Sequence, residues 1–170
     1  LGRVELEDQL AGVDHLKALP YVDPARIGIT GWSYGGYLTL FAVTNAPDVF
    51  RAAVAGAPVT DWKHYDSIYT ERYMGTPESN PKGYETSSPL LKAAEVEADL
   101  LLIHGSGDDN VHYQGTERLI NRLVELGKPF DLMVYPNRTH SISEGPGTSA
   151  HVYNRIARYF VEHLPPGPAR

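Results

Sequence analysis

Residues 31–36 read GWSYGG and directly follow the short apolar run RIGIT at residues 26–30. That run is typical of a β-strand, and the stretch YGGYLTLFAVTNA after the serine is typical of a helix that ends before Pro47. Ser33 therefore stands in a tight turn between a strand and a helix. The glycines on both sides of it permit a close approach of chain segments that a Cβ atom would block. This unit restricts the fold to architectures in which a strand feeds directly into a helix.

Three further apolar runs predict strands at residues 52–57, 99–104 and 130–135, beside the first strand at 26–31. Helical spacing of apolar residues flanks these runs in three places. The residues concerned are Leu6, Leu10, Val13 and Leu16; Leu119, Leu123 and Leu126, closed by Gly127; and Val152, Ile156, Phe160 and Leu164 in a helix from about 148 to 163. Strands that alternate with helices predict an α/β fold with a parallel sheet. Runs such as LLLI are apolar on both faces, so we expect helices on both faces of the sheet.

The length of 170 residues suits a single domain with one hydrophobic core. Within it, residues 58–93 fit the alternating pattern badly, because they are rich in Tyr, Pro, Ser and Thr. We interpret this segment as an excursion over the edge of the sheet, where functional sites are common. The opening LGRVELEDQL lacks a methionine and enters a helical pattern at once, which indicates a segment of a longer protein.

Composition excludes several classes of function. The net charge of −6 disfavours nucleic acid as a partner, because tracking phosphates requires excess Lys and Arg. No apolar run approaches the roughly 20 residues of a membrane span. The chain has no cysteine, so disulfides and thiolate metal sites are excluded, and no histidine spacing of the H-E-x-x-H kind predicts zinc. We therefore expect neither a metal nor an organic cofactor. The N-terminus carries no signal pattern, but in a segment this does not assign a compartment.

The residues GWSYG match G-x-S-x-G, the nucleophile elbow of hydrolases. A serine on such a turn projects its hydroxyl from the sheet, and the amides at the start of the helix face a developing oxyanion. The alternative is a glycine-rich turn in which the serine only caps the helix. The strand before Ser33 and the helix after it are the context that the catalytic motif requires, and they favour the functional interpretation.

A nucleophilic serine needs a base that is itself oriented by an acid, and in hydrolases both follow the serine in the chain. Asp108 and His140 fit this order, since each lies just after a predicted strand, at the sheet edge where Ser33 emerges. Asp109 adjoins Asp108, and spacing alone does not decide between them. His104 ends a buried strand and is expected to be a hydrogen-bonded core residue. The other histidines lie on predicted helices or in the excursion and are expected to be solvated or to pack: His15, His64, His112, His151 and His163.

Taken together, GWSYGGY, YDSIYTERYMG and LLIHGSGDDNVH resemble the C-terminal catalytic domain of the prolyl oligopeptidase family of serine peptidases, most closely its dipeptidyl peptidase IV branch. The similarity extends over nearly the whole chain and implies the C-terminal part of an α/β-hydrolase fold. It implies release of N-terminal dipeptides after Pro or Ala from peptide substrates. Ser33 would be the nucleophile, His140 the base and Asp108, the first aspartate of GDDN, the acid.

The resemblance also implies a substrate pocket. Tyr34 would donate its backbone N–H to the oxyanion and place its ring near the residue before the scissile bond. Asn110 would contact the carbonyl group of the substrate's second residue. The walls of the proline pocket would be Val59, Trp62, Tyr65, Tyr69 and Val111. Aromatic faces suit a flat, compact proline ring, although any single tyrosine more often packs under a loop.

The chain departs from the family pattern in two respects. Ser141 follows the histidine, where the family usually has glycine. The first strands of the sheet, the tyrosine that supplies the second oxyanion donor, and the β-propeller that holds the substrate's amino terminus have no counterpart in these residues. The 170 residues can therefore carry the triad and still be inactive in isolation. The alternatives are an acylaminoacyl peptidase, an oligopeptidase or an esterase on the same fold, or a non-catalytic binding module. By resemblance, the last helix would contribute to a homodimer of the parent protein.

Overall fold

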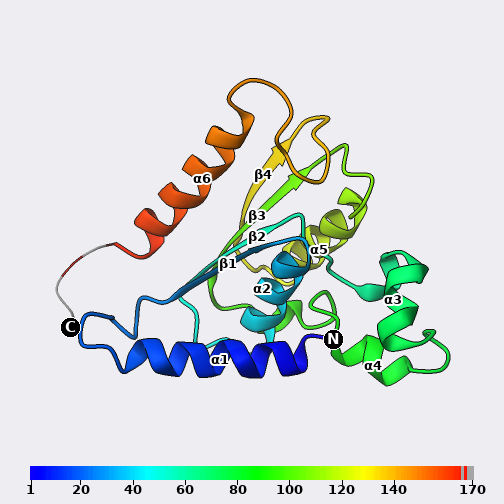
Figure 1. Cartoon of the computed structure of the whole chain (residues 1–170), viewed down its shortest axis with the longest axis horizontal. Helices are drawn as coiled ribbons and strands as arrows, with labels where there is room; N and C mark the ends of the chain where they lie inside the picture. Colours follow the sequence, from blue (N-terminus) through cyan, green and yellow to red (C-terminus); the bar gives the residue numbers. More distant parts are fainter. Residues whose placement is uncertain (166, 168–170) are drawn as a thin grey trace.

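The computed structural model describes residues 1–165 and residue 167. The other positions of the predicted domain, 166 and 168–170, lie outside the described residues. Within the described chain, four strands form one fully parallel sheet in the order β1-β2-β3-β4 (Figure 1). They are β1 (Gly28–Trp32), β2 (Ala52–Gly56), β3 (Asp99–Gly105) and β4 (Asp131–Tyr135). The predicted parallel sheet is confirmed, although β1 starts two residues later than expected and includes Trp32.

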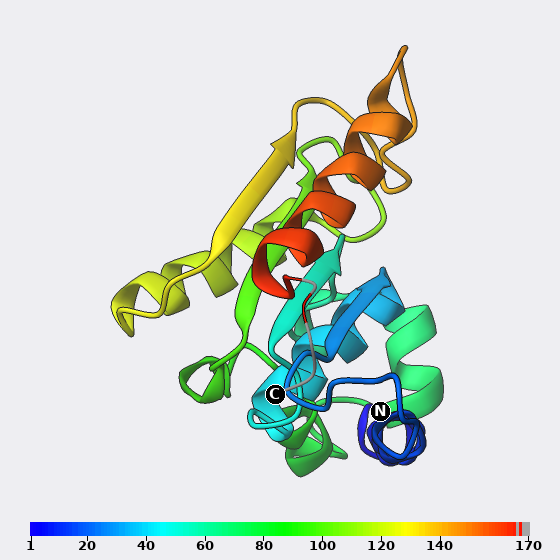
Figure 2. The same cartoon turned by 90° about the vertical axis from the view of Figure 1, so that its left-hand side faces the viewer.

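Helices cover both faces of the sheet, as its two-sided apolar character predicts. One face packs against α2 (Tyr34–Asn45) and α5 (Tyr113–Glu125), with α1 (Arg3–Lys17) lying against α2 in the same core. The other face packs against α6 (Thr148–His163), which lies in front of the strands in Figure 2. Alternate strand residues enter the two cores. Leu100 and Leu102 belong to the α2 side, whereas Leu101 and Ile103 belong to the α6 side. The sheet thus divides the buried interior into two clusters rather than the one core expected from the length, and both depend on β3, the longest strand.

The predicted apolar stripes are largely buried. Leu6, Val13, Leu119 and Leu123 are core residues. Leu16 differs from the prediction, because at the last turn of α1 it is 43% exposed. On the opposite face, α6 lies so close to β1 that a Cβ atom on Gly28 would come within 2.6 Å of the Phe160 ring.

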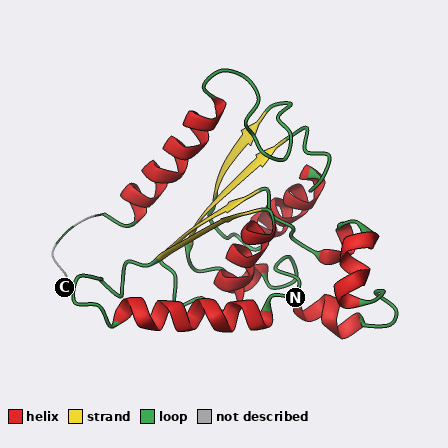
Figure 3. Ribbon diagram, viewed as in Figure 1, coloured by secondary structure: helices red, strands yellow, loops and turns green. Residues whose placement is uncertain are grey.

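The 58–93 segment leaves the sheet and contains short helices that its composition did not predict. They are the 3-10 turns η1 (Trp62–His64) and η2 (Ala93–Glu95) and the α-helices α3 (Ser67–Met74) and α4 (Pro81–Thr86). Figure 3 shows α3 and α4 standing apart from the strands. Asp66 and Asn80 begin these two α-helices by accepting hydrogen bonds from the amides of Tyr69 and Gly83. None of the described helices has the length and apolar character needed to cross a membrane.

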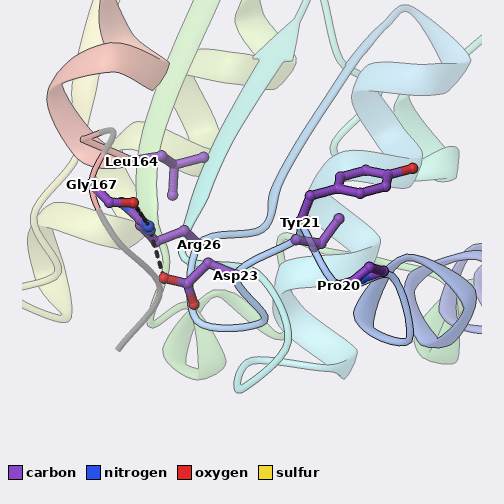
Figure 4. Close-up of a pocket in the computed structure, with 7 residues that line it drawn as sticks. Pro20, Tyr21, Asp23, Arg26, Leu164 and Gly167 are labelled. Carbon is purple, nitrogen blue, oxygen red and sulfur yellow. Dashed lines mark hydrogen bonds and ion pairs between the residues drawn. The ribbon is translucent and has the colours of Figure 1, made fainter.

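The chain enters β1 beside a surface hollow that also contacts the C-terminal segment (Figure 4). Here the Arg26 guanidinium donates to the carbonyl oxygen of Gly167 over 2.8 Å and to Asp23 Oδ2 over 2.7 Å. This hollow lies at the amino end of β1. Ser33 follows the carboxyl end of the same strand, so the hollow and the serine lie at opposite ends of β1.

Candidate active site

Ser33 occupies a sharp turn between β1 and α2. Its backbone has φ 60° and ψ −116°, a region that a residue with a Cβ atom rarely adopts. The amide of Ser33 donates to the carbonyl oxygen of Gly56 in β2 over 2.9 Å, which ties the turn to the neighbouring strand. A Cβ atom on Gly31 would lie 2.3 Å from the carbonyl oxygen of Gly35, so the turn can close only with glycine at position 31.

The glycine requirement on the helix side is one residue later than the motif indicates. Apart from its chain neighbours and the backbone of its own helix, no described atom lies within 4 Å of a Cβ placed on Gly35. A Cβ on Gly36, in contrast, would lie 2.4 Å from the carbonyl oxygen of Gly56. The expectation that close packing requires glycine on both sides of Ser33 is thus correct for Gly31 and wrong for Gly35. Gly36 is the residue that lets α2 approach β2.

The structure brings Ser33, His140 and Asp108 together in one hydrogen-bonded chain. His140 Nε2 lies 2.8 Å from Ser33 Oγ, and His140 Nδ1 lies 2.7 Å from Asp108 Oδ2. The Asp108 side chain is fully buried, whereas 20% of the His140 side chain is exposed. The imidazole therefore joins a buried carboxylate to a hydroxyl near the surface. Asp109, the acid that spacing left open, is exposed, and it is Asp108 that contacts the histidine.

The Asp108 carboxylate is held by the loop that follows β3. Oδ1 accepts hydrogen bonds from the amides of Asn110 and Val111, each over 3.0 Å. Oδ2 faces two imidazoles, His140 at 2.7 Å and His104 at 3.2 Å. A buried carboxylate needs such partners, because leaving its oxygens unpaired away from water is costly. The contacts also orient Oδ2 toward His140.

His140 lies on the loop between β4 and α6, and Glu144 holds that loop. The Glu144 carboxylate accepts hydrogen bonds from the amides of Thr139 and Ser143, each over 3.0 Å, and from the Thr139 hydroxyl. These contacts, led by the one from the Thr139 hydroxyl, lower the pKa of Glu144 to about 2. Between the two bridged amides, the buried Ile142 has φ 46°, a rare conformation for a β-branched residue. The loop is thus fixed on both sides of the imidazole.

The predicted pocket aromatics form one cluster next to Ser33. The Tyr34 ring lies 5.7 Å from Trp62, which stacks on Tyr69 at 5.9 Å. Tyr65 meets Trp62 and Tyr69 edge to face at 5.8 and 5.5 Å. Edge-to-face and stacked arrangements are favourable for aromatic pairs. The short helices of the 58–93 segment therefore bring three rings to the one that follows the serine.

The remaining predicted pocket residues lie at the border between this cluster and the Asp108 loop. The Tyr65 hydroxyl donates to Asn110 Oδ1 over 2.7 Å, which leaves the carboxamide nitrogen as the group able to donate to a ligand. Val59 and Val111 are buried and, with Tyr65, line one small hollow. The structure thus places the aromatic cluster and Asn110 against each other.

Glu5 contacts the site from a distant part of the sequence. Its carboxylate in α1 accepts hydrogen bonds from the Tyr34 hydroxyl and from the Gly2 amide. Partial burial would raise the pKa of Glu5, but the hydrogen bonds, chiefly that from Tyr34, outweigh it and lower this pKa. Burial, then the hydrogen bond to Glu5, raises the pKa of Tyr34 well above its ordinary value. The pair is therefore a neutral phenol donating to a carboxylate.

Sequence reasoning missed three of these contacts. His104 is buried and hydrogen-bonded, as expected, but its contact with Asp108 was not anticipated; the four-residue spacing at the end of β3 was the available signal. Glu144 lies only five residues from Thr139, which a local motif search could have found. Glu5 lies 29 residues from Tyr34, and nothing in the local pattern connects them. In the part of the chain that the structure describes, no cluster of three or more His, Asp or Glu side chains could hold a metal ion.

Comparison with known proteins places nearly the whole chain in one family. The sequence profile of the prolyl oligopeptidase family matches residues 1–166. Dipeptidyl peptidase 8 of Mus musculus is 44% identical over 168 residues, which are 96% of this chain and 19% of that protein. Dipeptidyl peptidase 4 of Felis catus is 40% identical over 165 residues, covering 95% of this chain and 21% of the relative.

Solved structures give the same result. The crystal structure of Porphyromonas gingivalis dipeptidyl peptidase 4 superposes with a TM-score of 0.93 at 47% identity, over 96% of this chain and 23% of that one. The chain spans about a fifth of the length of the curated relatives it matches. The family match over nearly all its residues, together with the α/β architecture, shows that this chain belongs to the prolyl oligopeptidase family.

Proposed function

We propose that this chain is the C-terminal catalytic portion of a serine peptidase that releases N-terminal dipeptides after Pro or Ala. One observation carries the proposal: His140 is within hydrogen-bond distance of both Ser33 Oγ and Asp108 Oδ2. This is the arrangement that makes a serine hydroxyl nucleophilic. The names of the relatives, dipeptidyl peptidases 8 and 4, support the dipeptidyl specificity.

The hydrogen bonds determine the tautomer of His140. An ionised Asp108 can only accept, so Nδ1 carries the proton and Nε2 is free to accept from the Ser33 hydroxyl. As Ser33 Oγ attacks the peptide carbonyl carbon, its proton passes to His140 Nε2, and Asp108 stabilises the imidazolium. The same proton then passes to the leaving amine as the C–N bond breaks. Water then attacks the acyl-enzyme while His140 takes a proton from it, and His140 returns a proton to Ser33 Oγ as the dipeptide leaves.

The oxyanion would be stabilised at the start of α2. Tyr34 is the first residue of that helix, and the first amides of a helix have no intrahelical acceptor. The Tyr34 N–H is thus available to the developing negative charge next to Ser33. We place the second oxyanion donor and the group that binds the substrate's amino terminus in regions of the longer protein outside these residues. The isolated chain is then expected to be much slower than the whole protein, because one missing donor costs about 10²–10³ in rate.

The aromatic cluster is proposed to bind the residue before the scissile bond. A proline ring is flat and apolar, and it gains contact area between aromatic faces such as those of Tyr34 and Tyr65. The Asn110 carboxamide nitrogen would donate to the carbonyl oxygen of the substrate's second residue. The pocket walls proposed from this arrangement are Tyr34, Val59, Trp62, Tyr65, Tyr69 and Val111.

The specificity is tested with the full-length protein on two chromogenic amides, Gly-Pro-p-nitroanilide and its N-blocked form. A dipeptidyl peptidase cleaves the free-amine substrate and not the blocked one. Equal cleavage of both would overturn the dipeptidyl assignment in favour of an acylaminoacyl peptidase or oligopeptidase. Hydrolysis of simple esters without either amide would indicate an esterase.

Catalysis itself is tested with a fluorophosphonate probe, which labels activated serines independently of peptide specificity. Wild-type protein should be labelled, and the Ser33→Ala variant should not. Absence of label on wild type, under conditions that label a control hydrolase, would identify the chain as a non-catalytic module.

We also propose that the full-length protein forms a homodimer to which α6 contributes. The helix presents Val161, 63% exposed, away from the sheet, which suits an intersubunit contact. Light scattering of the full-length protein should give a dimer, and Val161→Glu should shift it toward monomer. A monomeric wild type would overturn this assignment.

A further inference from the structure

His104 is a fully buried histidine directly behind the Asp108 carboxylate. Its Nε2 lies 2.8 Å from the carbonyl oxygen of Val111 and 3.2 Å from Asp108 Oδ2. Its Nδ1 lies 2.8 Å from the hydroxyl of Thr116 in α5. Neither His104 nor Thr116 has measurable exposure to solvent. Both ring nitrogens therefore have protein partners, and the proposed reaction uses neither.

These partners determine where the ring proton lies. The Val111 carbonyl and the ionised Asp108 carboxylate can only accept hydrogen bonds, so Nε2 must carry a proton and share it between them. Nδ1 is then the acceptor, and the Thr116 hydroxyl donates to it. Burial lowers the pKa of His104, although the contacts with Val111 and Asp108 oppose this effect. The ring is therefore neutral at the neutral pH at which the proposed peptidase would act. One neutral tautomer satisfies all the contacts.

We propose that His104 is a positioning residue for the triad, acting through Asp108 as a second imidazole donor. The inference rests on the proposed function. The His104 N–H bridges the Asp108 carboxylate to the carbonyl of Val111, and the amides of Asn110 and Val111 reach Asp108 Oδ1 from the same turn. The bridge closes that turn and holds Oδ2 toward His140.

The second donor has an electrostatic consequence. The carboxylate that stabilises the imidazolium of His140 accepts from His104 at the same oxygen, which moderates its charge. Without His104, Asp108 would attract the imidazolium more strongly while being less well oriented. We therefore expect two linked changes: a lower turnover number, and a higher pH for the protonation of His140. The ionisable side chains that face His104 are Asp108, His140 and Tyr113.

The test compares His104→Leu with His104→Gln in the full-length protein. Leucine fills the space without a donor, whereas the glutamine amide can donate near the position of Nε2. His104→Leu should lower kcat/KM for Gly-Pro-p-nitroanilide about tenfold through kcat, with KM unchanged, the loss expected for one hydrogen bond to a charged group. It should also raise the midpoint of the acid limb of the pH profile. His104→Gln should restore kcat to within about threefold of wild type and bring the midpoint of the acid limb back to the wild-type value.

A matched pair covers the case in which His104→Leu does not fold. Thr116→Val removes only the hydroxyl that donates to Nδ1, and Thr44→Val removes a buried hydroxyl of α2 that bonds the carbonyls of Leu40 and Phe41. Thr116→Val should lower kcat several-fold more than Thr44→Val. Equal effects of these two variants would overturn the inference.

The outcomes separate the inference from the proposed function. If wild type neither cleaves the amides nor reacts with the fluorophosphonate, the proposed function fails. If wild type is active and the folded His104→Leu variant keeps kcat/KM within twofold of wild type, with an unchanged pH midpoint, only the role of His104 fails. Equal losses of kcat/KM in His104→Leu and His104→Gln, with no change of the pH midpoint, would show that His104 only packs. That result would also overturn the inference.

Discussion

The indole N–H of Trp32 donates a hydrogen bond to the main-chain carbonyl oxygen of His140 over 2.9 Å. Trp32 is the residue immediately before Ser33, so this bond joins the serine turn to the histidine loop without using the side chains of the proposed triad. The Trp32 ring also covers Gly56, where a Cβ atom would lie within 2.0 Å of the indole. The distance between Ser33 and His140 thus depends on a side chain that the motif leaves unspecified.

Trp32→Phe is expected to lower kcat/KM by about two- to tenfold, which corresponds to the loss of one hydrogen bond of roughly 0.5–1.5 kcal/mol. Phenylalanine retains an aromatic ring over Gly56 but cannot donate to His140. Amide hydrolysis and the rate of fluorophosphonate labelling should fall together, because both depend on the pairing of Ser33 with His140. Unchanged labelling in a folded variant would contradict this role of Trp32.

Glu144→Gln should destabilise the His140 loop at neutral pH. The Glu144 pKa is lowered from 4.5 to about 2, so its contribution to stability is fully present above about pH 4.5 and is lost as the pH falls toward 2. Thermal unfolding should therefore show a lower Tm for the variant at pH 7 and a shrinking difference as the pH falls from 4.5 toward 2. Glu117→Gln, on the exposed side of α5, is the control and should show no such dependence.

Gly31→Ala and Gly35→Ala should have opposite effects despite their symmetric places in the motif. The new Cβ at position 31 meets backbone at 2.3 Å, which cannot be relieved by a side-chain rotation, so soluble yield and activity should be lost. At position 35 the space around the Cβ is open and alanine favours the helix, so the variant should fold and gain up to about 1 kcal/mol. Two equally damaging substitutions would show that the turn is packed differently.

Tyr34→Phe and Glu5→Gln should be coupled. Tyr34→Phe removes the phenol donor, and Glu5→Gln replaces the charged acceptor with a weaker neutral one, so each variant loses all or part of the hydrogen bond that anchors the Tyr34 ring to α1. A double-mutant cycle on KM for Gly-Pro-p-nitroanilide should give an interaction of about 1 kcal/mol. Additive effects would mean that Glu5 does not influence the ring. The matched control is Glu7→Gln, which removes an exposed carboxylate paired with Arg3 on the same helix.

The sheet was predictable because its strands are apolar on both faces, a pattern with few alternatives in a chain of this length. Helices α3 and α4 were not, since they have eight and six residues and bury few side chains, so no stripe marks them. Their start signals, Asp66 and Asn80, are local capping residues that also occur in ordinary turns. Short helices in a polar segment depend on tertiary contacts that composition does not reveal.

The candidate site was predictable to the extent that chain order determines it. Ser33, Asp108 and His140 follow strands that end at one sheet edge, and this order selects them before any distance is known. The choice of Asp108 over Asp109 and the bridge from His104 depend on side-chain directions within a four-residue turn. Contacts between residues far apart in the sequence, such as Glu5 and Tyr34, cannot be predicted from the spacing of residues within one segment.

Ser33 and His140 are 107 positions apart, and β2, β3 and β4 all lie between them. Pairings of such long separation form slowly, because the intervening chain must be ordered before the contact is gained. The proposed pairing of Ser33 with His140 cannot form until β4 has joined the sheet and the loop before α6 has folded. An incompletely folded copy of this chain therefore carries Ser33 without its proposed base.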